Sequence, residues 1–281
     1  EVHVLATADS ANFYTVTFYD ANDTVTVETQ DGEATHVFNA SGTYKIRTRA
    51  HTIQSAYIEK TEDVLITIST GNTGAPTSGF ISPLTYPNYT LVWQDEFNGA
   101  SLSPDWTYDL GTGSWGWGNN ELQYYKQENA VVSDGLLTIT AKSENFNTSN
   151  YTSSRIKTQG IKSWKYGRID VRAALPYGQG IWPAIWMLGD NITSAGWPAC
   201  GEIDIMEHVG KEQGIINWSA HSKMLNWPMG TQRTNKFYID SVSDNFHSYK
   251  LNWTKDYLQF YVDNTLCYTV SNEGKGSDYF P

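Results

Sequence analysis

Short runs of alternating apolar and polar residues, separated by turn residues, dominate this 281-residue chain, and helical periodicity of useful length is missing throughout. Successive side chains of a strand point to opposite faces, so such runs suit strands that bury one face. Turn signals at intervals of roughly 8–12 residues are typical of antiparallel sandwiches. The sequence therefore predicts an all-β protein built from antiparallel two-sheet sandwiches.

The composition along the chain divides it into two β-rich parts. We expect residues 1–70 to form a small β-sandwich, with strands at residues 13–19, 25–29, 35–38, 44–47 and 64–68. Residues 71–89 are rich in Gly, Pro, Ser and Thr and carry apolar residues without a period, which predicts a linker. A second β-domain over residues 90–281 is expected to contain strands at residues 90–93, 136–142, 155–159, 167–173, 181–188, 202–207, 215–223, 246–253 and 258–262.

Charge and aromatic content limit the kind of ligand. The formal net charge of −11 excludes the basic footprint that nucleic acid requires and argues against an anionic membrane surface. The chain contains 11 Trp and 18 Tyr, more than a core normally needs, which suits stacking on flat apolar ligand faces. No run of about 18 apolar residues occurs, so we expect no transmembrane segment. The predicted ligand is therefore neutral or polar.

The segment CGEIDIMEHVG, residues 200–210, places three carboxylates among apolar residues of strand-forming type. On a regular strand Glu202 and Asp204 share one face, whereas Glu207 points to the other. A β-bulge, one extra residue near Met206, shifts the phase and returns Glu207 to the face of Glu202. We therefore predict a bulged strand over residues 202–207 that presents all three acids on one face.

Three acids on one face suit glycoside hydrolysis, which uses one carboxylate as nucleophile or base and one carboxylic acid as proton donor. A third acid between them can influence which group holds the proton, because close carboxylates cannot all ionise. Two alternatives stay open on residue chemistry alone. Glu202, Asp204, Glu207 and His208 are all ligand types for a metal ion, or the strand is an exposed edge decorated with acids.

The acid segment resembles the bulged Glu-x-Asp-x-x-Glu catalytic motif of glycoside hydrolase family sixteen, in its laminarinase-like form. Further segments follow in the family's order: WQDEFNG at residues 93–99, WGWGNNELQYY at 115–125, RIKTQG at 155–160, YGRIDV at 166–171 and GIWPAIWML at 180–188. The resemblance covers about residues 90–270. It implies a β-jelly-roll sandwich with a catalytic cleft on its concave sheet.

The resemblance also implies a retaining mechanism. Glu202 would be the nucleophile and Glu207 the general acid and then the general base. Asp204 would hold Glu202 in position and in the right charge state. No cofactor is required by this chemistry.

Substrate-binding residues are also implied by the resemblance: Asn119, Glu121, Arg155, Trp182, Trp186, Trp197 and His221. Asn119 and Glu121 would bind donor-side sugars, and Trp197 would stack on a sugar next to the scissile bond. Arg155 would bind a sugar hydroxyl, with a surface ion pair as its alternative. Trp182 and Trp186 are four apart on a predicted strand and therefore line either the cleft or the core, and we favour Trp182 in the cleft.

Two histidines lie in or near the predicted site. The resemblance places His221 on the neighbouring strand near the acceptor sugars. His208 follows the acid motif, where it either tunes Glu207 or packs in the core.

Within the family, the laminarinase-like segments favour endo-cleavage of β-1,3-glucan, followed by mixed-linkage β-1,3/1,4-glucan. A galactan of agar or porphyran type is an alternative substrate, although a neutral glucan agrees better with the acidic chain. A glycan-binding, lectin-like module on the same sandwich is an alternative from another class. A third is an interaction or structural protein whose acids bind calcium.

The resemblance further implies a structural calcium ion with ligands near Glu96, from the Gly135 loop and from a last strand. Family members continue through two more strands after the point where this chain ends, at Pro281. We therefore expect the remaining segment as a separate associated piece. The chain starts at Glu1 without Met, which fits either a mature protein whose signal peptide has been removed or a trimmed chain, and we expect it to be secreted or held at the cell surface.

The segment THVFNASGTYKIRTRA, residues 35–50, resembles the hallmark of polycystic-kidney-disease-type (PKD) immunoglobulin-like domains. The resemblance implies that residues 1–70 form an immunoglobulin-like β-sandwich. A spacer role is the prediction for this part, with glycan binding as the second choice.

Overall fold

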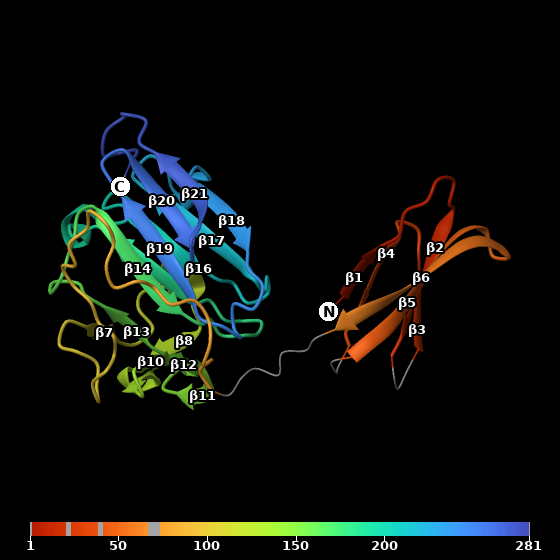
Figure 1. The fold of residues 1–281 in the computed structure, drawn as a ribbon, viewed down its shortest axis with the longest axis horizontal. Helices are drawn as coiled ribbons and strands as arrows, with labels where there is room; N and C mark the ends of the chain where they lie inside the picture. Colours follow the sequence, from red (N-terminus) through yellow and green to blue (C-terminus); the bar gives the residue numbers. More distant parts are fainter. Residues whose placement is uncertain (1, 21–23, 39–41, 67–73, 281) are drawn as a thin grey trace. The chain divides into compact units, whose positions relative to one another are not determined.

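The computed structural model describes the chain except for residues 1, 21–23, 39–41, 67–73 and 281. The described chain is almost entirely β-structure (Figure 1). It divides into two compact units, Glu1–Thr70 and Gly71–Pro281, and each unit has its own buried apolar cluster. Among the described residues, every helix is too short or too polar to traverse a lipid bilayer.

The first unit pairs a two-stranded sheet, β1-β4, with a four-stranded sheet in the order β3-β2-β5-β6. Its strands are β1 (Val2–Leu5), β2 (Phe13–Tyr19), β3 (Thr24–Thr29), β4 (Glu33–His36), β5 (Gly42–Ile53) and β6 (Ala56–Ile66). Val16 and Phe18 of β2, Ala34 of β4 and Ile46 of β5 meet in the core. The predicted strand at residues 64–68 lies in β6 as far as Ile66, and its last two residues fall outside the described chain.

The second unit contains two antiparallel four-stranded sheets, in the orders β14-β19-β20-β21 and β15-β16-β17-β18. Its strands are β7 (Thr107–Asp109), β8 (Gln123–Tyr125), β9 (Ala130–Ser133), β10 (Leu136–Ile139), β11 (Lys142–Phe146), β12 (Ser149–Ser153), β13 (Arg155–Lys157), β14 (Gly167–Ala173), β15 (Ala184–Leu188), β16 (Glu202–Glu207), β17 (Ile215–His221), β18 (Arg233–Tyr238), β19 (His247–Trp253), β20 (Tyr257–Val262) and β21 (Thr265–Ser271). Short helical turns are η1 (Gly116–Asn120), η2 (Gln127–Asn129), α1 (Ile192–Ala195) and η3 (Trp227–Met229). Smaller sheets are formed by β13-β7, β11-β12-β8 and β10-β9.

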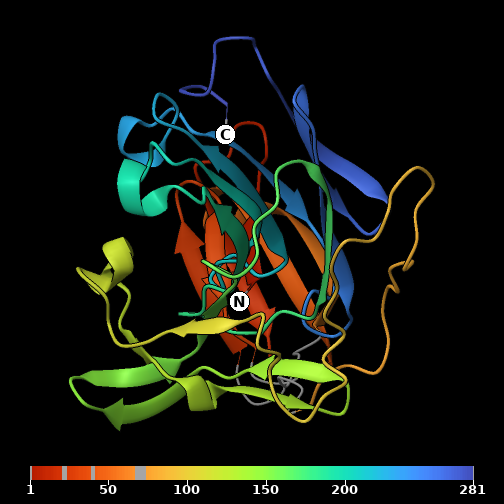
Figure 2. The same cartoon turned by 90° about the vertical axis from the view of Figure 1, so that its left-hand side faces the viewer.

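The core of the second unit lies between its two large sheets. Ile203 of β16 and Trp218 of β17 pack with Leu251 of β19 and Phe260 of β20, all of them 3% exposed or less. Figures 1 and 2 show β19, β20 and β21 running side by side. Because alternate residues of a strand point to opposite faces, β16 has a second face turned away from this core, here called the open face.

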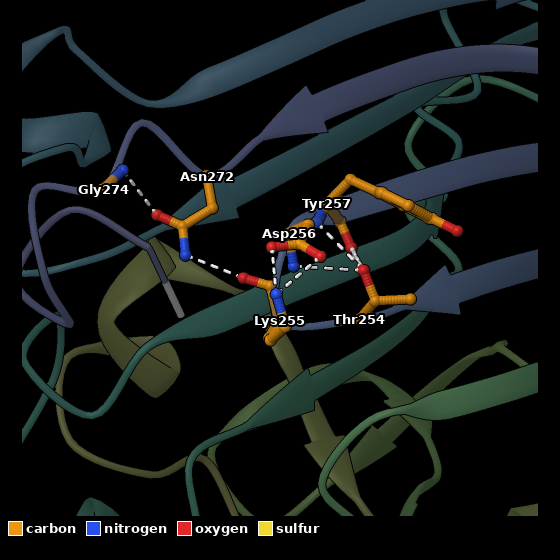
Figure 3. Close-up of polar contacts among 6 residues, drawn as sticks. All are labelled: Thr254, Lys255, Asp256, Tyr257, Asn272 and Gly274. Carbon is orange, nitrogen blue, oxygen red and sulfur yellow. Dashed lines mark hydrogen bonds and ion pairs between the residues drawn. The ribbon is translucent and has the colours of Figure 1, made fainter.

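A side-chain network closes the turn between β19 and β20 (Figure 3). Thr254 Oγ1 accepts hydrogen bonds from the backbone N–H groups of Asp256 and Tyr257, both at 3.1 Å. Asn272, just after β21, donates from Nδ2 to the Lys255 carbonyl oxygen at 2.8 Å. The network therefore ties the end of β21 to the neighbouring turn.

Several sequence predictions differ from the structure. The strand expected at residues 90–93 is absent; Trp93 there packs on Trp106 and Trp164 and donates to Asp105, so side chains rather than a ladder hold the segment. The strand expected at residues 136–142 is divided between β10 and β11. The pairing is not wholly antiparallel either, because β12 and β8 run parallel.

Part of the predicted linker belongs to the second unit. Residues 78–86, here called the strap, lie along the outer face of the β14–β21 sheet. Phe80 N–H donates to the Phe246 carbonyl at 2.7 Å, and Phe246 N–H donates to the Ser78 carbonyl at 3.0 Å. Tyr86 O–H donates to Asp170 on β14. The strap is therefore bound to the sheet rather than free, because its backbone finds hydrogen-bond partners there.

Candidate active site

Strand β16 carries a bulge between its acids. Its pairing with β17 is regular from Glu202 to Asp204, shifts register, and resumes at Glu207. Consecutive residues Ile205 and Met206 are both 1% exposed and both belong to the core. Two core residues in succession change the phase of the strand, so Glu207 returns to the open face. The predicted bulge is confirmed, and the exposed-edge alternative is wrong because β16 lies between β15 and β17.

His221 lies opposite Glu202 on the neighbouring strand β17. Its Nε2 atom is 3.3 Å from Asp204 Oδ2 and 3.9 Å from Glu202 Oε1. Trp197 lies against the His221 ring, with ring centroids 5.7 Å apart. The Glu202 end of β16 therefore carries an acid pair, an imidazole and a half-exposed indole.

Glu207, at the other end of β16, has an indole partner of its own. Trp182 Nε1 donates to Glu207 Oε1 at 3.0 Å, and Trp182 is 50% exposed. The predicted strand at residues 181–188 begins only at Ala184, so Trp182 precedes β15 and does not share its alternation with Trp186. Trp186 pairs with Asp204 across β15 and β16 and lies outside the core, whereas its neighbours Ile185 and Met187 pack against the core.

The carboxyl groups of the site have raised pKa values. Burial, with the nearby Asp204 charge, raises the pKa of Glu202 to about 8. Burial and the charge of Glu207 raise the pKa of Asp204 well above its ordinary range. Burial also raises the pKa of Glu207, against the opposing hydrogen bond from Trp182. Burial lowers the pKa of His221, which disfavours its charged form. The site therefore retains carboxyl protons at neutral pH.

A second polar cluster centres on Glu121. Its Oε2 atom accepts hydrogen bonds from Gln123 Nε2 at 2.6 Å and from Tyr125 O–H at 2.7 Å, and Asn119 Nδ2 donates to Oε1 at 3.1 Å. The structure therefore brings the predicted pair Asn119 and Glu121 together. Sequence reasoning did not assign roles to Gln123 and Tyr125, although both lie in the quoted segment 115–125.

Arg155, on β13, connects the Glu121 cluster to the β16 sheet. Its guanidinium lies over the rings of Trp117, Tyr125 and Trp186, at 4.4, 5.7 and 5.2 Å from their centroids. Its Nε donates to Asp109 Oδ2 at 2.7 Å, in a largely buried ion pair. The ion pair thus exists but is not a simple surface pair. The roles of Trp117 and Asp109 were missed because their spacing from Arg155 in the sequence carries no signal.

The remaining predicted residues lie elsewhere. His208 is fully buried, with Nδ1 at 2.9 Å from the Ile215 carbonyl and Nε2 at 3.4 Å from Gln213 Oε1, so it packs rather than joins the acids. For the expected calcium ion, Asn98 Oδ1 lies 3.5 Å from where a Cβ on Gly135 would be. The segment that contains Glu96 thus meets the Gly135 loop, and both offer the oxygen donors that calcium prefers.

Three acids, indoles and hydrogen-bonding side chains on the open face of a β-sandwich define a site for carbohydrate chemistry. The family model of Glycosyl hydrolases family 16 matches residues 118–281. A β-glucanase of Rhodothermus marinus is 46% identical over 195 residues, which cover 66% of this chain and 67% of the relative. Glucan endo-1,3-beta-glucosidase A1 of Niallia circulans is 35% identical over 71% of this chain and 31% of the relative.

A solved structure, the laminarinase from Flavobacterium sp. UMI-01, is also similar. It is 46% identical and superposes with a TM-score of 0.64, over 68% of this chain and 82% of the laminarinase. The chain belongs to glycosyl hydrolase family 16, and its second unit is a β-jelly roll.

Proposed function

We propose that the chain is a retaining endo-glycosidase that cleaves internal bonds of β-1,3-glucan of the laminarin type. Mixed-linkage β-1,3/1,4-glucan is its second substrate. The bulge in β16 carries the proposal, since it brings Glu207 to the same face as Glu202 and Asp204. The identity to a β-glucanase, an endo-1,3-glucosidase and a laminarinase supports the choice of glucan.

In the proposed mechanism Glu202 attacks the anomeric carbon and Glu207 protonates the departing glycosidic oxygen. Glu207 then removes a proton from water, which displaces Glu202 from the sugar. The nucleophile must be ionised although its pKa in the free protein is about 8. Asp204 lies beside Glu202 and also has a raised pKa, so a proton that resides on Asp204 leaves Glu202 as the anion.

Substrate contacts follow from the positions of the surrounding side chains. The half-exposed rings of Trp197 and Trp182 flank the two ends of the acid strand and stack on sugars there. Asn119 and Glu121 hydrogen-bond donor-side hydroxyl groups, and Arg155 contributes a further donor. His221 positions the Glu202–Asp204 pair on the acceptor side.

Other properties belong to the same proposal. The first unit serves as an immunoglobulin-like spacer of the PKD type, and the protein is secreted or held at the cell surface. The Glu96 segment and the Gly135 loop would hold a structural calcium ion, which would stabilise the jelly roll.

Incubation with laminarin, barley mixed-linkage glucan and agarose, followed by sizing of the products, tests the proposal. We expect new reducing ends from laminarin first, with oligosaccharide products of the β anomer at early times by NMR. Glu207→Gln should lower kcat by about 10²–10⁴-fold, since general acid catalysis contributes that much. Retention of laminarin without cleavage would favour a lectin-like module instead, and substantial turnover by Glu207→Gln would refute the assignment.

A further inference from the structure

Donor atoms from two strands converge on one point of the open face. Glu202 and Asp204 come from β16 and His221 from β17, and one ligand atom of each lies within 4.8 Å of the others. His221 Nε2 is 3.3 Å from Asp204 Oδ2 and 3.9 Å from Glu202 Oε1. In the part of the chain that the structure describes, this is the one group of His, Cys, Asp or Glu side chains that converges in this way.

His221 is the member that distinguishes the group from a simple cluster of acids. It is 7% exposed, and its Nε2 edge faces the two carboxyl groups. Its Nδ1 atom is buried and has no hydrogen-bond partner among the described residues. A neutral imidazole with its proton on Nδ1 directs the Nε2 lone pair towards the carboxyl groups, which is the form that ligates metal ions.

We propose that Glu202, Asp204 and His221 form a binding site for a divalent transition-metal ion of the Zn²⁺ class, which reversibly inhibits hydrolysis. The inhibition, but not the binding, rests on the proposed function. A metal ion held by Glu202 would occupy the nucleophile and the place of the sugar next to it.

The donor set favours zinc over calcium. One imidazole nitrogen and two carboxyl groups, which release their protons when the ion binds, match a three-residue zinc site with one position open to water. Calcium takes 6–8 oxygen ligands, which these side chains do not supply. Ligands about 2.0–2.2 Å from one zinc ion lie at most about 4 Å apart, so His221 and Asp204 already fit. Glu202 Oε1 lies 3.9 Å from His221 Nε2, within the same limit.

The surroundings of His221 indicate weak rather than permanent binding. Ligating histidines usually donate their second N–H to a protein group, and loss of that partner lowers metal affinity by about 10–100-fold. His221 Nδ1 has no such partner among the described residues. A reversible inhibitory ion therefore fits the site better than a resident one.

Calorimetric titration of zinc chloride into the full chain carrying Glu207→Gln tests binding without hydrolysis, since all three ligands remain. We expect one zinc ion per chain and weaker zinc binding when laminari-oligosaccharide is present. Adding His221→Asn should weaken zinc binding at least tenfold. The matched control adds His247→Asn to the same Glu207→Gln chain. His247 lies on the other large sheet and pairs with Asp263, so zinc affinity should stay unchanged. Equal zinc affinity with and without His221→Asn would overturn the proposal.

A second measurement does not depend on variants. Crystals of the natural chain soaked in zinc chloride should give an anomalous peak bounded by Glu202, Asp204 and His221, and a peak elsewhere only would overturn the proposal. In assays, zinc should inhibit laminarin hydrolysis, and EDTA should restore it. Zinc at the site with no glucan hydrolysis in metal-free buffer would refute only the proposed function. Full hydrolysis with the site occupied would refute the inference.

Discussion

Individual ionisable residues decide what the open face can do. Glu202, Asp204 and Glu207 are held where water solvates them poorly, so each pKa is raised, mainly by burial. Poor solvation opposes ionisation, and close like charges oppose it further. The site therefore retains the proton that a general acid needs. The same poor solvation lowers the stability of the folded state when these carboxyl groups ionise.

The destabilisation that the Glu202 carboxylate causes in the folded state should depend on pH. The carboxyl group has a pKa of 4.5 in the unfolded chain and about 8 in the folded one, so between these values the folded state binds more protons. Stability attributable to this group therefore falls as pH rises from about 4.5 to 8 and is constant below that window. Glu202→Gln should raise the Tm of the second unit relative to the natural chain by about 2–4 °C at pH 8.

The increase in Tm of the Glu202→Gln chain should vanish near pH 4.5, as measured by thermal unfolding followed by circular dichroism. Glu128→Gln, at an exposed carboxyl, is the matched control and should follow the natural chain at every pH. A Glu202→Gln protein that is equally or less stable at pH 8 would contradict the pKa assignment.

Trp182 should set the alkaline limit of activity. Its N–H donates to Glu207 and holds down the pKa of that carboxyl, which burial otherwise raises. Trp182→Phe keeps an aromatic ring but removes the donor, so the pKa of Glu207 should rise and the acid stay protonated to higher pH. The alkaline limb of kcat/KM should move up by about 0.5–1 pH unit.

The measurement is a pH profile of laminarin hydrolysis with a chelator present. Trp227→Phe provides the comparison, because Trp227 lies in η3 and is 71% exposed. If the alkaline limb of kcat/KM stays in place or moves to lower pH, the Trp182 N–H does not control the pKa of Glu207.

Two elements position the site and support the sheet behind it. The bulge in β16 re-aims Glu207, and it persists because Ile205 and Met206 both bury in the core. The strap covers the other sheet, where Phe80 lies over Lys250, with Nζ 4.5 Å from the ring centroid. Lys250 is 1% exposed and its Nζ is 4.0 Å from Asp170 Oδ2, so the strap shields a lysine in the middle of a strand.

Loss of the strap's aromatic ring should destabilise the second unit. Phe80→Ala removes the ring contact and opens Lys250 to water, and we expect a loss of about 2 kcal/mol in the free energy of unfolding. Urea unfolding of the full chain, followed by tryptophan fluorescence, measures it. Ile81→Ala, at a neighbour that is 78% exposed, should change stability by no more than about 0.5 kcal/mol. Equal stabilities for the two variants would mean that residues 78–86 behave as a linker after all.

The whole molecule consists of two units with separate cores, and the candidate site lies in the second. Every acid of the candidate site and every assigned sugar-binding residue falls within residues 90–281. Catalysis on a soluble substrate therefore should not need the first unit.

Removal of residues 1–70 should leave kcat and KM for soluble laminari-oligosaccharides unchanged within about twofold, since domains with their own cores fold and act separately. Calorimetry of the full chain should give two thermal transitions, and one of them should disappear in the shortened chain. A single transition, or a large loss of kcat on removal, would show that the units depend on each other.

Local patterns were enough to predict the all-β class, the strands at residues 13–19, 167–173 and 202–207, and the phase error that requires a bulge. Each of these depends on alternation within a few residues, which the sequence carries directly. Three-residue strands such as β7 and β8 are too short to show a period, so they were missed.

Long-range packing decided the rest. Alternation alone could not show that His221, rather than His208, faces Asp204, because that depends on the register of β17 against β16. Arg155 among three aromatic rings, Trp182 beside Glu207 and the strap over Lys250 likewise join segments far apart in the chain. The sequence by itself determined which chemistry the chain carries. Only the tertiary structure decided which side chains surround each acid, because burial and neighbouring charges arise from strand pairing and not from local order.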